Sequence, residues 1–448
     1  LGDSASVNAR ADHDLPAYGV WADNSGTNIL GKGSTITSSA TGKSNSAALF
    51  AANGGANQVG NGAQIKAETE TGFAYGVETD QGTNKLGENI NIYSHSSKFS
   101  AYGMSTSGTQ GSTTVKDGLV IQTIADGGQA IGIFNGQEGI TTIGNQASII
   151  ATGSAGSGDG IDISGGKVKM GDNATIQVKG SSGGTGISIG QETGSSVVET
   201  GKNTSITVES DDMSAGILND GGTMTASDNF SAHVSGVIDS YGVATADGGN
   251  TTIGSSASIS VESKEQDETG SIAVYTVGGN TVIGDNSTIT AAVTAGTASG
   301  VNTTEGNTTL GNQVSIKASG ETAYGVNSTN GRTTLGNHAS VYASGNTAYG
   351  VASQESTTEG TDDLGKTIQV SVSGVNQIGA EALIKAISTN GNAYGVYSDN
   401  NLANNIGKNQ IGAGAQIQAA SITGDAYGVY AANSGANQID AGAKIQAT

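Results

Sequence analysis

The stretch "AYGVNSTNGRTTLGNHASVYASGNTAYGV", residues 323–351, ends on the four letters with which it begins. Tyr324 and Tyr349 lie 25 residues apart, and Leu335 repeats Leu310 at the same distance. A fixed period of this kind is the signature of a protein assembled from stacked copies of one supersecondary unit. We therefore searched the remainder of the chain for the same unit first.

Two elements recur along the chain. The first is "AYGV" or a close variant, in which Gly and then Val or Met follow the tyrosines Tyr18, Tyr75, Tyr102, Tyr324, Tyr349, Tyr394 and Tyr427. The second is sharper, as in "IGNQASIIA" from Ile143 and "LGNQVSIKA" from Leu310. The second element recurs on average every 29 residues or so, which predicts about 15 copies in the chain.

The second element alternates between two kinds of side chain. In strings such as "ASIKA", one parity carries Ala, Ile or Val, and the other carries Ser, Gln, Thr or Lys. This period of two predicts a strand with one buried and one solvent-facing side. "AYGV" predicts a second strand and "TTLG" or "TVIG" a third. No segment has a sustained apolar stripe of helical period, so we expect almost no helix.

Three short strands per repeat are accommodated most simply by one repeat per coil of a parallel β-helix, because stacked coils bury a continuous apolar face that one coil cannot bury alone. We thus expect an all-β, single-domain solenoid over residues 1–448, with about 15 coils. Identical residues then lie above one another. Ile149, Ile289, Ile316 and Ile417 should point into the core in one column, and the residue after each "IG" should form a ladder at a turn: Asn145, Asp172, Asp285, Asn312 and Asn337.

The tyrosine of "AYGV" shares strand parity with the aliphatic residue two places on. This parity predicts an aromatic stack at a corner of the core, with the hydroxyl groups reaching water. An alternative interpretation is a ladder of rings that binds sugar.

Composition indicates an exported protein. The chain has no cysteine, 73 glycines in 448 residues and a single proline. The absence of cysteine is typical of a bacterial passenger that crosses the periplasm without disulfides.

The formal net charge of −21 disfavours nucleic acid and anionic membrane surfaces as partners. No apolar run is long enough to span a membrane, so we expect no direct insertion. Both ends fall inside a repeat, which suggests a piece of a longer protein.

Two polar, acidic segments interrupt the pattern, near residues 262–271 and 352–377. Because they do not alternate, we expect loops that project from the solenoid. Loops on a rigid scaffold commonly carry recognition, so the predicted binding residues are the acids of these inserts: Glu262, Glu265, Asp267, Glu268, Glu355, Glu359, Asp362 and Asp363.

The sequence offers little for catalysis. The four histidines, His13, His95, His233 and His338, are far apart, and no metal-ligand spacing is present. His233 and His338 fall in positions that other repeats fill with Gln, Asn or Ser. A glycan-cleaving β-helix would need carboxylates beside a basic partner in one cleft, and the 18 Lys and Arg residues are scattered. We therefore expect no catalytic residues, no metal and no cofactor.

The Gly-, Ser-, Thr- and Asn-rich, cysteine-free, acidic repeats resemble the passenger domains of Gram-negative autotransporter adhesins. The resemblance implies a right-handed β-helix displayed at the cell surface. It further implies adhesion to sister copies on neighbouring cells, or to a host glycan or protein receptor. The "IGxxAxI" strings also resemble the head repeats of trimeric autotransporter adhesins, which form a left-handed roll with coils of half this length. A glycan-cleaving enzyme and a passive stalk are the alternatives from other functional classes.

Overall fold

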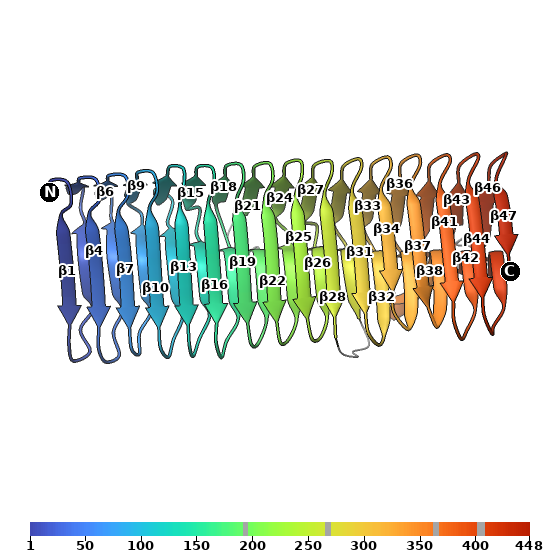
Figure 1. The fold of residues 1–448 in the computed structure, drawn as a ribbon, viewed down its shortest axis with the longest axis horizontal. Coiled ribbons are helices and arrows are strands. Elements are labelled where there is room, and N and C mark those ends of the chain that lie inside the picture. Colours follow the sequence, from blue (N-terminus) through green and yellow to red (C-terminus); the bar gives the residue numbers. More distant parts are fainter. Residues whose placement is uncertain (191–195, 265–269, 362–366, 401–407) are drawn as a thin grey trace. The chain divides into compact units, whose positions relative to one another are not determined.

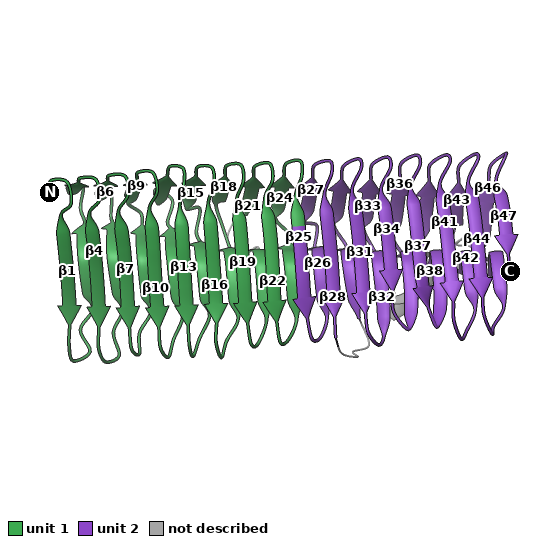
Figure 2. Ribbon diagram, viewed as in Figure 1, with its two compact units in different colours: residues 1–231 green, residues 232–448 purple. Residues whose placement is uncertain are grey.

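The computed structural model describes residues 1–190, 196–264, 270–361, 367–400 and 408–448 (Figure 1). The contacts within the chain divide it into two compact units, Leu1–Ser231 and Ala232–Thr448, which Figure 2 colours green and purple. The predicted single domain stays a prediction. All regular structure in the described residues is β-strand, as the period-two pattern predicts.

Unit 1 is a three-sheet solenoid whose strands return to the same sheet once per coil (Figure 1). Sheet A contains β1 (Ser6–Ala11), β4 (Thr35–Ala40), β7 (Gln64–Thr69), β10 (Asn91–Ser96), β13 (Val120–Ala125), β16 (Ser148–Gly153), β19 (Thr175–Gly180) and β22 (Ser205–Ser210). Sheet B contains β2 (Ala17–Ala22), β5 (Ser46–Ala52), β8 (Ala74–Asp80), β11 (Ala101–Ser107), β14 (Ala130–Asn135), β17 (Gly158–Ile163), β20 (Gly184–Ile189) and β23 (Ser214–Asp220). Sheet C contains β3 (Thr27–Leu30), β6 (Ala56–Val59), β9 (Thr83–Leu86), β12 (Ser112–Val115), β15 (Ile140–Ile143), β18 (Lys167–Met170), β21 (Val197–Thr200) and β24 (Thr223–Ala226).

Unit 2 repeats this architecture after β25 (Ser231–Gly236), which includes the division. Sheet A contains β28 (Ser258–Ser263), β31 (Thr288–Val293), β34 (Ser315–Ser319), β37 (Ser340–Gly345), β41 (Leu383–Ser388), β44 (Gln416–Ser421) and β47 (Lys444–Ala447). Sheet B contains β26 (Ser240–Ala246), β29 (Ser271–Val277), β32 (Thr297–Thr304), β35 (Thr322–Thr329), β38 (Thr347–Thr361), β42 (Ala393–Asn400) and β45 (Ala426–Asn433). Sheet C contains β27 (Asn250–Ile253), β30 (Asn280–Ile283), β33 (Asn307–Leu310), β36 (Arg332–Leu335), β40 (Val375–Ile378), β43 (Lys408–Ile411) and β46 (Ala436–Ile439).

Each full repeat forms one coil. Strands of successive coils pair in parallel and in register, so that Ala323 lies beside Ala348 and Tyr324 beside Tyr349. The fold is the predicted right-handed parallel β-helix, with about 14 turns in the described residues, close to the expected number. Because one coil uses all three unlike strands, the repeat does not split into the two shorter, equivalent coils of a left-handed roll.

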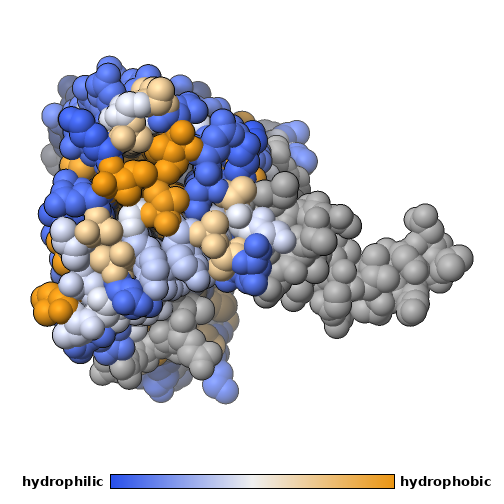
Figure 3. All heavy atoms as spheres, turned by 90° about the vertical axis from the view of Figure 1, so that its right-hand side faces the viewer, coloured by the Kyte–Doolittle hydropathy of each residue, from blue (hydrophilic) through white to orange (hydrophobic). Residues whose placement is uncertain are grey.

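The core is an aliphatic column along sheet A in each unit. Ile149 in unit 1 and Ile289, Ile316 and Ile417 in unit 2 are at most 1% exposed, as predicted. Ile289 pairs directly with Ile316 in the next coil. Seen from the β47 end, hydrophobic side chains gather within unit 2 and hydrophilic ones flank them (Figure 3). Stacking of like residues thus gives every coil the same dry contact.

The predicted turn ladder is present between sheets C and A. The Oδ1 atom of Asp285 accepts from the backbone N–H of Asn312 at 2.6 Å, and Asn312 Oδ1 accepts from the N–H of Asn337 at 2.9 Å. In unit 1, Asn145 Oδ1 accepts from the N–H of Asp172 at 2.8 Å. Each side chain thereby satisfies a backbone donor of the following coil at a turn where the strands leave donors unpaired.

A second ladder lies inside the solenoid, at the corner between sheets B and C, and the sequence analysis did not predict it. The hydroxyl groups of Thr276, Thr281 and Thr245 are completely or almost completely buried and lie 2.8 to 3.0 Å apart along this chain. Elsewhere the ladder is built of amides, as where Asn376 donates to Asn409 Oδ1 at 2.8 Å. Buried polar groups are tolerated here because they bond to one another from coil to coil.

The second insert contains regular structure. β38 extends beyond the edge of its neighbour and pairs in antiparallel fashion with β39 (Thr367–Ser373), from Glu355 opposite Ser373 to Thr361 opposite Thr367. A strand pair therefore occupies much of the segment 352–377, where a loop was expected. In the first insert, β28 ends at Ser263 and β29 begins at Ser271, and residues 265–269 are outside the described residues.

Candidate functional site

The tyrosines of "AYGV" lie on the outer face of sheet B, and the prediction that they face the core is wrong. The reason is the glycine. In β35, Ala323, Gly325 and Val326 are buried, so Gly and Val face inward consecutively and the alternation breaks. A Cβ on Gly325 would overlap the side chain of Val341 and lie 2.6 Å from the carbonyl oxygen of Gly350, so only glycine fits this close approach. Tyr324 is left facing outward.

Two columns of side chains therefore run along the outside of sheet B. We call them the tyrosine column, at the second letter of "AYGV", and the flanking column, three residues later. In unit 2 the tyrosine column contains Tyr324, Tyr349, Tyr394 and Tyr427. Successive rings are 4.7, 4.9 and 5.1 Å apart between centroids, and their planes differ by only 6° to 8°. The strand spacing of the sheet thus sets the spacing of the rings.

The flanking column of unit 2 adds a second tyrosine pair. Tyr397 and Tyr430 stack with centroids 5.7 Å apart and planes 5° apart. They meet the tyrosine column edge to face, with Tyr394 and Tyr397 at 69° and Tyr427 and Tyr430 at 61°. The result is a herringbone of amphipathic rings, an arrangement favoured by the quadrupoles of aromatic groups.

The internal amide ladder positions the flanking column. Asn409 Nδ2 donates to the carbonyl oxygen of Tyr397 at 2.7 Å, and Asn437 Nδ2 donates to that of Tyr430 at 2.7 Å. The Asn409 side chain is fully buried and donates also to Asn437 Oδ1 at 2.8 Å. The backbone that carries the outer rings is therefore held from inside by a continuous hydrogen-bonded chain.

The phenol groups of this face are oriented by neighbouring polar side chains. Tyr397 Oη donates to Asp399 Oδ2 at 3.0 Å, and Asn392 Nδ2 donates to Tyr394 Oη at 3.1 Å. At the next coil, Tyr427 Oη donates to Asp425 Oδ2 at 2.9 Å. Burial, followed by the Asp399 bond and charge, raises the pKa of Tyr397, so this phenol keeps its proton.

Two buried acceptors stand in the flanking column without a donor. The column continues from Tyr397 through Ala352 to Asn327 and Asn302. Asn327 is 7% exposed, and the Oδ1 atoms of Asn327 and Asn302 are buried with no hydrogen-bond partner in the described structure. An unsatisfied buried acceptor costs stability, so its presence next to the tyrosine herringbone marks this face as a candidate binding site.

The same face of unit 1 is aromatic but different in kind. Tyr75 and Tyr102 stack with centroids 4.9 Å apart, and Tyr18 stacks on Phe50 at 5.7 Å. Here the flanking column carries Trp21, which is 50% exposed, in register with Phe50. Phenylalanine and tryptophan make this part of the face more apolar than its counterpart in unit 2.

Carboxyl groups interrupt the aromatic face of unit 1. Asp159 takes a place in the tyrosine column, and Glu78 and Asp162 stand in the flanking column. Burial, with a smaller effect of the Asp162 charge, raises the pKa of Asp159 to about 7, although Gln129 Nε2 donates to its Oδ2 at 3.1 Å. Burial and the Asp80 charge raise the pKa of Glu78 to about 7. Both groups therefore change charge near neutral pH.

Of the eight acids predicted as binding residues, three belong to described strands. Glu262 is exposed on the outer face of sheet A in β28, whereas Glu355 and Glu359 belong to β38 of sheet B. Glu265, Asp267, Glu268, Asp362 and Asp363 lie outside the described residues. The binding role of the acidic inserts stays a prediction.

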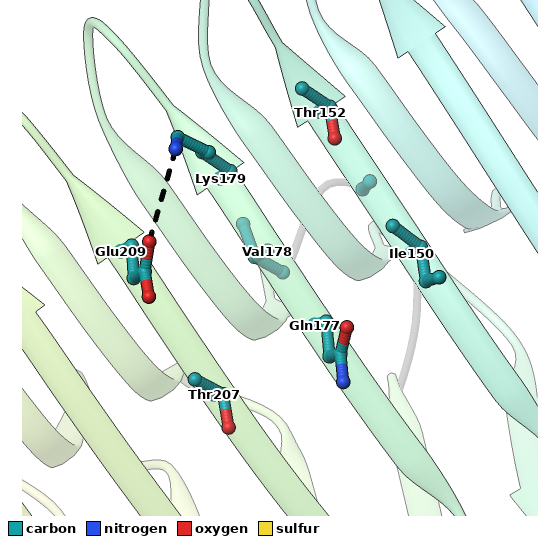
Figure 4. A pocket seen from close by; sticks show the side chains of 8 residues that line it. Ile150, Thr152, Gln177, Val178, Lys179, Thr207 and Glu209 are labelled. Carbon is teal, nitrogen blue, oxygen red and sulfur yellow. Dashed lines mark ion pairs between the residues drawn. The ribbon is translucent and has the colours of Figure 1, made fainter.

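The outer face of sheet A is polar and nearly flat. Figure 4 shows a shallow depression on it in unit 1, where side chains of β16, β19 and β22 form two rows. One row is Ile150, Gln177 and Thr207, and the other is Thr152, Lys179 and Glu209. The Lys179 Nζ and Glu209 Oε2 atoms are 4.0 Å apart on this exposed face, where such a pair contributes little stability.

Neither a metal-binding cluster nor a membrane-spanning helix occurs among the described residues. Among them, no group of three or more His, Cys, Asp or Glu side chains is arranged to hold a metal ion. His95 Nε2 lies 2.9 Å from Asp126 Oδ2, and His338 Nδ1 lies 3.3 Å from Glu381 Oε2, both as isolated surface pairs. No helix in this part of the chain is long and apolar enough to cross a bilayer.

Comparisons of the chain with protein-family models, with curated proteins and with solved structures found no match.

Proposed function

We propose that the chain is the display region of a bacterial surface adhesin, exported to the cell exterior, where it acts without catalysis. Its partners are sister copies on neighbouring cells or a receptor on a host surface. The proposal rests on one observation: large aromatic side chains lie in two columns along the outside of sheet B.

Partly exposed rings in register favour binding over passive support. Tyrosine and tryptophan supply large contact areas at a low entropy cost, which is why they dominate recognition surfaces. A stalk needs only polar outer faces such as the one on sheet A. The repetition of the columns also suits multivalent contact, in which weak contacts at successive coils add to a strong attachment.

The experiment is attachment of beads coated with the 448-residue chain to bacterial and epithelial cells, and to one another. We expect coated beads to clump or attach, while beads coated with serum albumin do not. If chain-coated beads behave as albumin-coated beads do, the adhesin proposal is wrong. The enzyme alternative predicts release of reducing sugar ends from a glycan panel, which the same protein preparation can test.

A further inference from the structure

We infer that the sheet B face of unit 2 binds a neutral oligosaccharide chain, through the tyrosine herringbone and the adjacent Asn302 and Asn327 acceptors. The inference rests on the proposed adhesive function and names the chemistry that its receptor presents. It concerns unit 2 alone.

The first argument is the match between the surface and a pyranose. A sugar ring presents a patch of C–H groups on its face and hydroxyl groups around its rim. The herringbone of Tyr394, Tyr397, Tyr427 and Tyr430 presents aromatic area with phenol groups interspersed, so that C–H groups can pack on rings while hydroxyl groups bond to polar atoms.

The second argument is the pair of unfilled acceptors. The Oδ1 atoms of Asn302 and Asn327 are buried in adjacent coils of the flanking column and receive no hydrogen bond from the described residues. Because both oxygens are covered in the unbound chain, a hydroxyl-rich ligand supplies the missing donors when the asparagine side chains turn outward on binding. Asn327 already uses its Nδ2 group toward Thr329 Oγ1 at 3.5 Å, which leaves the carbonyl oxygen for a partner. Satisfying a buried acceptor on binding contributes specificity as well as affinity.

The third argument is charge, which selects the class of glycan. The strand sequences "TAYGVNST", "AYGVYSDN" and "AYGVYAAN" contain no Lys or Arg. Asp399 and Asp425 add negative charge at this face, where they accept from tyrosine hydroxyls. Sulfated or sialylated chains would be repelled, and so would the identical face of a second copy. A neutral chain meets no such penalty.

The test is binding of the fluorescently labelled 448-residue chain to immobilised oligosaccharides: neutral chains of galactose and N-acetylglucosamine, the same chains sialylated, and the same chains sulfated. We expect binding to neutral chains. The double variant Tyr397→Ala/Tyr430→Ala should bind at least about tenfold more weakly, since loss of one dominant contact corresponds to that factor. Tyr342→Ala is the matched control, because Tyr342 is a partly exposed tyrosine of unit 2 on sheet A.

Two further variants separate recognition from folding. Tyr397→Phe/Tyr430→Phe retains the rings and should recover most of the affinity if stacking matters. Asn327→Leu removes the acceptor while leaving the aromatic face intact, and should weaken binding without lowering the melting temperature, because the unsatisfied oxygen is removed.

Three results would overturn the inference. The first is no binding of the chain to neutral oligosaccharides, and the second is binding to charged oligosaccharides alone. The third is equal binding by the double variant and by Tyr342→Ala. A dimer in analytical ultracentrifugation that the double variant abolishes would assign the face to a second copy instead. If beads attach to cells while the glycan panel is silent, the glycan inference fails and the adhesin proposal stands; if beads do not attach either, the adhesin proposal fails.

Discussion

Unit 1 and unit 2 are built from the same coil, yet they present different chemistry on the same face. In unit 1 the sheet B face mixes Tyr75 and Tyr102 with Phe50 and Trp21, and buried carboxyl groups stand among the rings. In unit 2 every ring on that face is a tyrosine, because the five phenylalanines and the single tryptophan of the chain all precede residue 232. The coil therefore fixes the spacing of the outward side chains and leaves their identity free.

The largest expected effect tests whether the two units share one type of core. Ile149→Asp in unit 1 and Ile316→Asp in unit 2 should each cost several kcal/mol of folding free energy, because a buried, unpaired carboxylate has no compensating partner. Thermal unfolding followed by circular dichroism measures both. A melting temperature left unchanged in either variant would show that the columns are not equivalent.

The internal ladder offers a sharper contrast between single coils. One coil of unit 1 has Val168 beside Ile163 at the ladder position, although the coil before it has Thr141 bonded to Asn135, and unit 2 has Thr281 bonded to Thr276. Thr281→Val should cost about 2 kcal/mol, since Thr245 and Thr276 each lose a hydrogen-bond partner.

The apolar pair of that one coil of unit 1 can be introduced into unit 2 as a check. Thr276→Ile combined with Thr281→Val reproduces the Ile163 and Val168 pair within one coil. Denaturant titration should show that the second change restores part of the stability lost by the first. If the double variant loses more unfolding free energy than the two single variants lose together, the ladder positions are not exchangeable.

The carboxyl groups of unit 1 make its face sensitive to pH. The pKa of Asp159 rises from 3.8 to about 7 in the folded chain. Stability from this group is therefore complete below its unfolded pKa and is lost as pH rises to about 7, because the unfolded chain releases the proton first. Asp159→Asn should stabilise the protein by about 1 to 2 kcal/mol at pH 8 and change little at pH 3.

Melting temperatures measured from pH 3 to pH 8 test this difference. Asp211→Asn is the control, because Asp211 is an exposed carboxylate of unit 1. An equal gain in both variants at pH 8 would show a general effect of net charge instead of burial at Asp159.

The smallest expected effect concerns the turn ladder. Asp285→Ala should cost about 1 kcal/mol, since the backbone N–H of Asn312 loses an exposed acceptor and can bond to water instead. Asp172→Ala in unit 1, where Asp172 Oδ1 accepts from the N–H of Lys202 at 2.8 Å, should cost the same. Equilibrium unfolding of the two variants side by side would detect a difference between the units.

The fold was predictable because it depends on period and parity alone. Ile316 and Asn312 were assigned correctly from alternation and from their place after "LG". Tyr324 was assigned to the wrong face because Gly325 breaks the alternation. A single glycine in a strand sequence does not indicate that the glycine and the next residue, Val326, both face inward. That the glycine recurs in each "AYGV" was the signal that could have revealed a close approach between sheets.

The candidate site was less accessible from sequence. Asn302 and Asn327 read as ordinary polar strand residues, and only the register of β32 and β35 places them in one column with Tyr397. The threonine ladder was missed for a related reason: in "NTTL" both threonines look suited to solvent, while Thr308 is almost completely buried and bonds to Thr276 at 2.9 Å.

The strict register between coils has a consequence for how such a chain changes in evolution. Residues 323–347 span one complete coil, and Thr322 and Thr347 occupy equivalent places in β35 and β38. If this segment is deleted, β32 meets β38 with Ala beside Ala and Val beside Val; if it is duplicated, the added coil finds the same partners above and below. Unequal recombination between repeats therefore lengthens or shortens the protein without leaving a mismatched seam, and each coil gained or lost adds or removes one position in both outer columns of sheet B.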